Sequence, residues 1–139
     1  MGLTLDTSAL IDLLRGDRRT LAAIDRLEGE GLTPVLSSVA VFEALSGIEF
    51  TRSLAERAML ELTLKQIPIE PFDLDSARRA GQLRAELFRA GKSPGAPDVM
   101  IAGHGLAQGH TLLTRDKGLA ASASALGLSV VLLETPKGA

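Results

Sequence analysis

Five short apolar runs, separated by longer segments of helical periodicity, constrain the fold of this chain more than any other feature. The runs predict strands at residues 3–5, 34–36, 67–69, 112–113 and 129–133. Helical spacing of apolar residues predicts helices at residues 8–14, 19–28, 39–50, 54–64, 75–90, 98–108 and 119–126. Strands that alternate with helices favour an α/β fold, in which helices flank both faces of a mainly parallel central sheet.

The helix predicted at residues 75–90 has the clearest apolar stripe. The stripe consists of Ala77, Ala80, Leu83, Leu87 and Phe88. The helix predicted at residues 98–108 contains Gly103 and Gly105, each of which costs about 1 kcal/mol relative to alanine. Glycines kept at that cost indicate close packing of this helix against another element.

Length and composition indicate one domain, residues 1–139, with an aliphatic core. Hydrophobic residues make up 45% of the chain, which is long enough to bury a sizeable core. Aromatic residues make up only 3%, which argues against binding of single-stranded nucleic acid on stacking platforms. The lack of cysteine excludes disulfides, thiolate metal sites and a cysteine nucleophile.

Four acidic residues stand at or near the start of a predicted helix, and three of them follow a strand-like run directly or nearly so. This acidic quartet is Asp6, Glu43, Asp98 and Asp116. In an open α/β sheet, ligands bind outside the carboxyl ends of the strands, so carboxylates delivered there can converge on one pocket. Two such charges at about 4 Å repel by roughly 1 kcal/mol in water and about 4 kcal/mol at an effective dielectric of 20. A hard divalent cation such as Mg²⁺ or Mn²⁺ would offset this repulsion.

Helix capping is the simpler explanation for three of the four residues when each is taken alone. Asp6, Asp98 and Asp116 stand at strand-to-helix turns, where aspartate often caps a helix N-terminus. Glu43 differs, because it lies inside an apolar helical run where capping explains nothing. A carboxylate buried there is costly unless it is paired or metal-bound, and exposure on the solvent face is the alternative.

Converging carboxylates suit the hydrolysis of a phosphodiester. Two metal ions roughly 3.5–4 Å apart can stabilise both the attacking and the leaving oxygen of an in-line displacement. Arg115 and Lys117 flank Asp116 at the rim of the expected pocket, where they are candidates for phosphate contact. No Walker A loop competes with this interpretation. His104 and His110 are expected to be ordinary surface or edge residues.

Charge and hydropathy predict a cytoplasmic protein without a membrane span. No apolar run approaches the roughly 18 residues that a spanning helix requires, and the N-terminus resembles a strand rather than a signal peptide. The formal net charge is −2, and setting the acidic quartet aside leaves 15 basic against 13 acidic residues. The charge balance therefore neither excludes nor favours a nucleic acid as partner.

Four motifs resemble those of the PIN-domain ribonucleases, in particular the VapC-type toxins of toxin–antitoxin pairs. They lie at residues 5–16, 38–47, 97–102 and 114–116, in the order and spacing of that family. The second contains a glutamate followed four residues later by glycine, and the fourth reads Thr-x-Asp. Singly these motifs are weak, but jointly they are specific and cover nearly the whole chain.

The resemblance implies an endoribonuclease that cleaves RNA with Mg²⁺ or Mn²⁺. According to the resemblance, the metal-binding and catalytic residues are Asp6, Glu43, Asp98 and Asp116. It also implies Thr7 and Thr114 as hydrogen-bonding support, and with Arg115 and Lys117 they form the candidate substrate-binding set. The implied partners are a second copy of the chain, in a homodimer, and a small VapB-like antitoxin whose C-terminal segment blocks the acidic pocket.

The partner surface can be anticipated in outline. An acidic pocket is best closed by a cation, so the antitoxin is expected to present an arginine or lysine to the quartet. Its apolar contacts are expected on the aliphatic helix surface at residues 39–62, which is equally the candidate homodimer contact. The sequence does not separate these two uses.

Other functions remain as alternatives. A non-enzymatic, receiver-like signalling domain is also α/β, but it requires an acidic pair after its first strand, where Asp6 stands alone. A phosphatase with an aspartyl nucleophile requires a second aspartate two residues later, where Ser8 stands. An inactive PIN scaffold that only binds a partner would not need the intact quartet.

Overall fold

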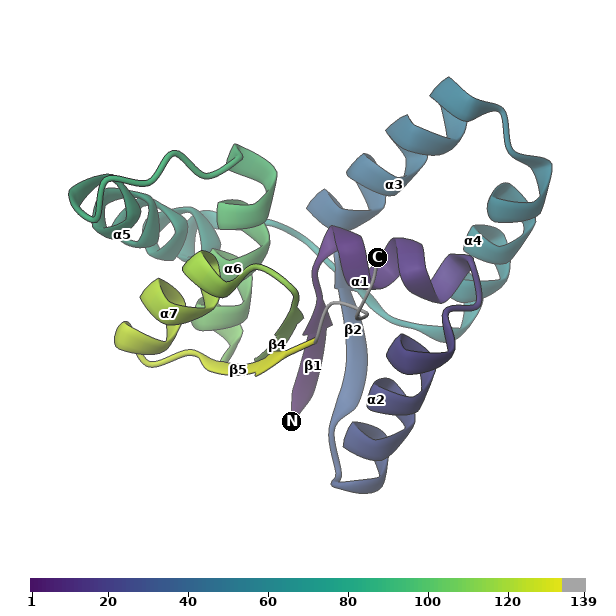
Figure 1. Ribbon diagram of the computed structural model, residues 1–139, viewed down its shortest axis with the longest axis horizontal. Helices are drawn as coiled ribbons and strands as arrows, with labels where there is room; N and C mark the ends of the chain where they lie inside the picture. Colours follow the sequence, from purple (N-terminus) through teal and green to yellow (C-terminus); the bar gives the residue numbers. More distant parts are fainter. Residues whose placement is uncertain (134–139) are drawn as a thin grey trace, which may run out of the picture.

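A computed structural model describes residues 1–133, and its centre is a five-stranded parallel sheet (Figure 1). The strand order is β3-β2-β1-β4-β5, and every neighbouring pair is parallel. The strands are β1 (Gly2–Leu5), β2 (Thr33–Ser37), β3 (Ile69–Glu70), β4 (Thr111–Thr114) and β5 (Ser129–Leu132). Because β1 lies between β2 and β4, the carboxyl ends of these three strands share one edge of the sheet.

Seven helices in the described part of the chain connect the strands and cover the sheet. They are α1 (Thr7–Leu14), α2 (Arg18–Gly29), α3 (Ser38–Thr51), α4 (Leu54–Gln66), α5 (Leu74–Arg89), α6 (Ala96–Gln108) and α7 (Lys117–Ala125). Figure 1 shows α1 to α4 on one side of the sheet and α5 to α7 on the other. Within residues 1–133, no helix is both long and apolar enough to cross a membrane.

The structure confirms the predicted α/β fold, and each predicted strand and helix overlaps an observed one. The poorest match is β3, which was expected at residues 67–69 and comprises only Ile69 and Glu70. Pro68 and Pro71 bound this strand, and proline cannot donate a ladder hydrogen bond, so pairing is limited to two residues.

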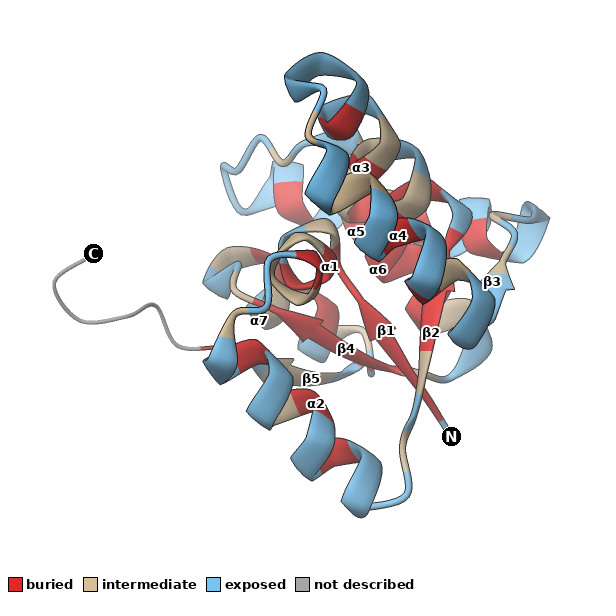
Figure 2. Cartoon of the chain, turned by 90° about the vertical axis from the view of Figure 1, so that its right-hand side faces the viewer, coloured by how far each residue is buried: buried red, intermediate tan, exposed pale blue. Residues whose placement is uncertain are grey.

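The core is aliphatic, as the composition predicted. Leu3, Leu5, Leu112 and Leu113 of the central strands are wholly buried, and Figure 2 shows β1 and β4 buried along their length. Burial on both faces is typical of parallel strands that are covered by helices on each side. The strands therefore form a fixed support for the residues that follow their carboxyl ends.

Close packing of α6 against α5 explains one of the two costly glycines. A Cβ atom at Gly103 would lie 2.5 Å from the backbone nitrogen of Ala80, closer than real Cβ atoms approach. The apolar stripe predicted for α5 is confirmed at Ala80, Leu83 and Leu87, which are buried, and is wrong at Ala77 and Phe88, which are exposed. Ser76 is buried on the same face, and its hydroxyl and its backbone N–H both donate to Asp73, the residue that caps α5.

Candidate active site

Asp6 and Asp116 emerge from neighbouring strands and cap the helices that follow. Asp6 directly follows β1, and its Oδ1 accepts a 2.8 Å hydrogen bond from the Ala9 N–H in α1. Asp116 follows β4 by two residues, and its Oδ1 accepts a 3.0 Å hydrogen bond from the Leu119 N–H in α7. Because β1 and β4 are adjacent and parallel, both carboxylates lie at the same edge of the sheet. These two residues therefore cap helices and also lie close to each other at the edge of the sheet.

Glu43 reaches this edge from α3, the helix that begins where β2 ends. The Thr7 hydroxyl donates a 2.5 Å hydrogen bond to Glu43 Oε1. Glu43 is half-buried, so the alternative of a side chain on the open solvent face is wrong. The hydrogen bond holds the carboxylate against the start of α1, one residue from Asp6.

Asp98 lies in the first turn of α6 and is influenced by the other three carboxylates. Burial raises its pKa from the ordinary 3.8 to about 6, and the charges of Glu43, Asp6 and Asp116 add to the rise. Burial also raises the pKa of Asp6, although hydrogen bonding from the Thr114 side chain opposes that rise. The structure thus brings the whole acidic quartet within electrostatic reach of one residue.

Within residues 1–133, no lysine, arginine or histidine nitrogen lies within 4.0 Å of a quartet carboxylate. The nearest arginine in the sequence, Arg115, is paired elsewhere, with Nη2 2.6 Å from Asp12 Oδ2 and 3.7 Å from Asp17 Oδ2. Carboxylates that repel one another and lack a cationic partner suit a hard divalent ion. The residues present therefore fit the Mg²⁺ or Mn²⁺ that the sequence predicted.

The candidate substrate-binding residues lie next to the quartet in the sequence, and they differ in how accessible they are to a ligand. Thr114 is wholly buried, and its hydroxyl oxygen accepts the Asp116 N–H at 3.1 Å. Lys117 opens α7 and is exposed, so it is free to meet a phosphate. Arg115 would have to leave its ion pair with Asp12 to do the same.

The expectation that both histidines are ordinary surface or edge residues is wrong for His104, which is 0% exposed inside α6. Glu70 Oε1 lies 3.0 Å from His104 Nε2 and 2.6 Å from His110 Nε2. In the described part of the chain, one ligand atom from each of these three residues lies within 4.8 Å of the other two. Among the described residues, no three carboxylates of the quartet come together as closely. No local signal could have predicted this group of three, because Glu70 lies 34 residues before His104 and the histidines lack the i, i+4 spacing of a helical metal motif.

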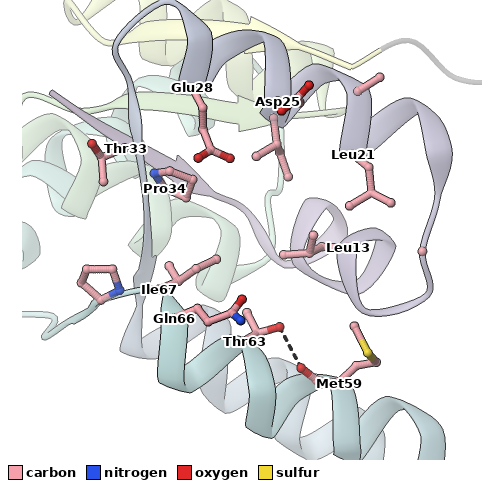
Figure 3. Close-up of a pocket in the computed structure, with 14 residues that line it drawn as sticks. Leu13, Leu21, Asp25, Glu28, Thr33, Pro34, Met59, Thr63, Gln66 and Ile67 are labelled. Atoms are coloured by element: carbon pink, nitrogen blue, oxygen red, sulfur yellow. Dashed lines mark hydrogen bonds between the residues drawn. The ribbon is translucent and has the colours of Figure 1, made fainter.

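A largely apolar hollow of about 780 Å³ lies between α1, α2, α4 and β2 (Figure 3). Its apolar wall includes Leu13, Leu21, Ile24, Met59 and Ile67. Asp25 and Glu28 of α2 also line it, so the hollow combines apolar contact area with negative charge. That combination suits an apolar segment with basic residues.

Comparison with known proteins matches residues 3–124 to the family model of the PIN domain. The chain is 36% identical over 83 residues to the tRNA(fMet)-specific endonuclease VapC of Shigella flexneri, covering 58% of this chain and 62% of that protein's length. It is 32% identical over 123 residues to the VapC ribonuclease Y4jK of Sinorhizobium fredii, covering 82% of this chain and 86% of the relative. A solved toxin–antitoxin complex from Klebsiella pneumoniae contains a similar chain, with a TM-score of 0.72, 25% identity and coverage of 96% of this chain and 99% of that one.

Proposed function

This chain belongs to the PIN-domain family, and from that premise we propose that it is a metal-dependent endoribonuclease that acts as the toxin of a toxin–antitoxin pair. One feature carries the proposal: four carboxylates come from four separate segments at the edge of the sheet, and three of them add to the raised pKa of the fourth, Asp98. The similar proteins named as an endonuclease and a ribonuclease support RNA as the substrate. They favour an enzyme over the receiver-like signalling domain and over a scaffold that only binds.

The acidic quartet would hold Mg²⁺ or Mn²⁺, because oxygen ligands of this kind suit hard cations. When bound, the ion would lower the pKa of the attacking water and stabilise the charge that develops on the phosphodiester. The chain's own bonds orient the ligands, since the Ala9 N–H holds Asp6 and the Thr7 hydroxyl holds Glu43. Carboxylates oriented in advance need little rearrangement when they bind.

A proton competes with the cation at Asp98. The pKa of this residue is about 6, so a large fraction of it is protonated below that pH in the absence of metal. Metal ligands must be deprotonated to bind, so metal affinity is expected to fall as the pH drops below about 6. Cleavage at low metal concentration should then decline in the same pH range, and excess metal should restore part of it.

Cleavage of a structured RNA by the purified chain tests the proposed activity. Internal cuts are expected with Mg²⁺ or Mn²⁺, and their loss is expected on addition of EDTA. Asp98→Asn removes one ligand charge at nearly constant volume and is expected to lower the rate at least about 100-fold. The matched control is Asp75→Asn, the same change at an exposed position in α5, which should leave the rate unchanged. Full cleavage by the Asp98 variant, or cleavage that persists in EDTA, contradicts the proposal.

A protein partner is supported by apolar surface that lacks cover within residues 1–133. The exposed large apolar side chains on α3 and α4 are Phe42, Phe50, Leu54, Met59 and Leu62, all inside the surface predicted at residues 39–62. The hollow beside α4 adds a concave apolar site whose acidic residues attract a basic segment. We assign the hollow to the antitoxin, and the surface with the three most exposed of these residues, Phe42, Phe50 and Leu54, to a second copy of the chain, since a two-fold contact pairs one patch with itself. The antitoxin would also present its arginine or lysine to the quartet.

Two variants separate these partner surfaces, and each is the control for the other. Leu21→Asp adds charge to the hollow and is expected to reduce co-purification of the small protein encoded next to the chain. Leu54→Asp adds the same charge to the exposed apolar surface of α3 and α4 and is expected to convert a dimer to a monomer on size-exclusion chromatography. A lone protein that is harmless in its host, with no small protein co-purifying, would contradict the toxin assignment while leaving the nuclease assignment to the cleavage assay.

A further inference from the structure

A second group of possible metal ligands lies apart from the acidic quartet. Glu70 ends β3, His104 lies in the buried part of α6, and His110 directly precedes β4. One ligand atom of each lies within 4.8 Å of the other two. We propose that these three residues form a second metal site, which takes a divalent transition metal of the Zn²⁺ class. This proposal does not depend on the proposed ribonuclease activity.

The donor set distinguishes this site from the quartet. Two imidazoles and one carboxylate are a common ligand set for Zn²⁺, with a fourth position left for water. Imidazole nitrogen suits Zn²⁺, Cu²⁺, Ni²⁺ and Fe²⁺, whereas Mg²⁺ and Mn²⁺ prefer an all-oxygen site such as the quartet. The two sites therefore belong to different classes of ion.

The distances are close to those that a tetrahedral ion requires. Zn²⁺ bonds to nitrogen and oxygen are about 2.0–2.2 Å long, so neighbouring ligand atoms stand about 3.4 Å apart. Glu70 Oε1 lies 3.0 Å from His104 Nε2 and 2.6 Å from His110 Nε2. The Glu70 side chain is 30% exposed, so a shift of less than about 1 Å toward solvent would open the required space.

The buried His104 ring gives an energetic reason for an ion. Within residues 1–133 neither of its nitrogens makes a hydrogen bond of acceptable geometry, although Glu70 Oε1 is near Nε2. A buried polar group without a partner lowers the stability of the folded state, and a metal bond at Nε2 would give this ring a partner. Burial lowers the pKa of His104, while the charge of Glu70 opposes this, so the ring is held in the neutral form that binds metals.

The surrounding backbone holds the other imidazole in place. A Cβ atom at Gly2 would lie 2.2 Å from His110 Nδ1, so the ring lies directly against the start of β1 and turns Nε2 toward Glu70.

The proposed site is separate from the acidic quartet. His104 lies six residues beyond Asp98 in α6, roughly 9 Å along the helix axis at 1.5 Å per residue. An ion at this site would join β3, which pairs over only two residues, to α6 and to the beginning of β4.

Cobalt absorption of the metal-free, untagged full chain tests the site directly. The chain contains two histidines and no cysteine, so imidazole-ligated Co²⁺ must involve His104 or His110. The expected result is a visible absorption band that saturates at one Co²⁺ per chain, is displaced by Zn²⁺ and is unaffected by excess Mg²⁺. If stoichiometric Co²⁺ gives no such band, the proposal is wrong.

Substitutions then identify the ligands. His110→Gln and Glu70→Gln are expected to lower Zn²⁺ affinity at least tenfold, measured by calorimetry on variants with native circular dichroism. Asp98→Asn is the control, because it alters the quartet and should leave the cobalt band and the Zn²⁺ affinity unchanged. Wild-type affinity in both ligand variants, or loss of the band in the Asp98 variant alone, would overturn the assignment.

Discussion

At the scale of single residues, the cost of gathering like charges is concentrated at Asp98. Partial burial, together with the charges of three carboxylates, raises its pKa to about 6. A folded-state pKa above the unfolded value means that ionising Asp98 opposes folding. The residue is kept in a position that lowers stability, which is typical of groups that serve a ligand.

Asp98→Asn is expected to stabilise the metal-free protein in a pH-dependent way. The folded-state pKa of about 6 exceeds the ordinary 3.8, so the free energy of unfolding of the parent chain falls as the pH rises between these values and is level above them. Asparagine does not ionise, so the variant lacks this pH-dependent loss of stability. The variant should therefore be no more stable than the parent chain below about pH 3.8, and its gain in the free energy of unfolding should be complete above about pH 7. Urea unfolding in EDTA at a series of pH values measures the gain. An equal gain at acidic and neutral pH would indicate a cause other than the charge.

Thr7 is expected to act as a positioning residue through its 2.5 Å hydrogen bond to Glu43. Thr7→Val keeps the shape but removes the donor, and should lower kcat about tenfold or more, because small displacements of a catalytic group are costly. Thr7→Ser restores a donor and should recover most of the rate. Both variants should keep a melting temperature close to that of the parent chain. Equal rates for the valine and serine variants would show that the hydrogen bond does not matter to cleavage.

At the scale of helices and strands, the contact between α5 and α6 gives a sharp test of packing. Gly103→Ala would place a methyl group 2.5 Å from the backbone of Ala80, which cannot move aside as a side chain tip can. Overpacking of this kind costs about 1–3 kcal/mol, so the melting temperature should fall. Gly81→Ala in α5 is the matched control, since a Cβ there meets nothing within 4 Å and alanine should stabilise the helix by about 1 kcal/mol. Opposite signs in thermal unfolding are the expected result.

Local patterns predicted the elements more completely than the contacts between them. The quartet positions could be anticipated because a strand end and a helix start are both local signals, as at Asp6. The contact between His104 and Glu70 could not, because it depends on the approach of two segments that are distant in the sequence. The short β3 lies between these cases, since the flanking prolines are visible in the sequence but β2, the strand with which β3 pairs, is distant along the chain.

At the scale of the whole molecule, two regions of one fold carry two different chemistries. The carboxyl ends of β1, β2 and β4 deliver oxygen ligands, whereas the space between β3, α6 and the start of β4 gathers nitrogen ligands. Separate ions at these places would stabilise different parts of the fold. Their effects on unfolding should then respond independently to substitutions.

Metal ions are therefore expected to raise the melting temperature of the whole chain through separable sites. An ion that binds only the folded state adds about 2.7 kcal/mol at a concentration one hundred times its Kd, which corresponds to several degrees for a domain of this size. Mg²⁺ or Mn²⁺ should produce this rise by relieving repulsion in the quartet, and NaCl of matched ionic strength should not. The rise with Mg²⁺ should disappear in Asp98→Asn and persist in His110→Gln, whereas the rise with Zn²⁺ at low concentration should show the reverse. A shift with NaCl as large as that with Mg²⁺ would mean that screening alone, rather than a specific ion, relieves the quartet.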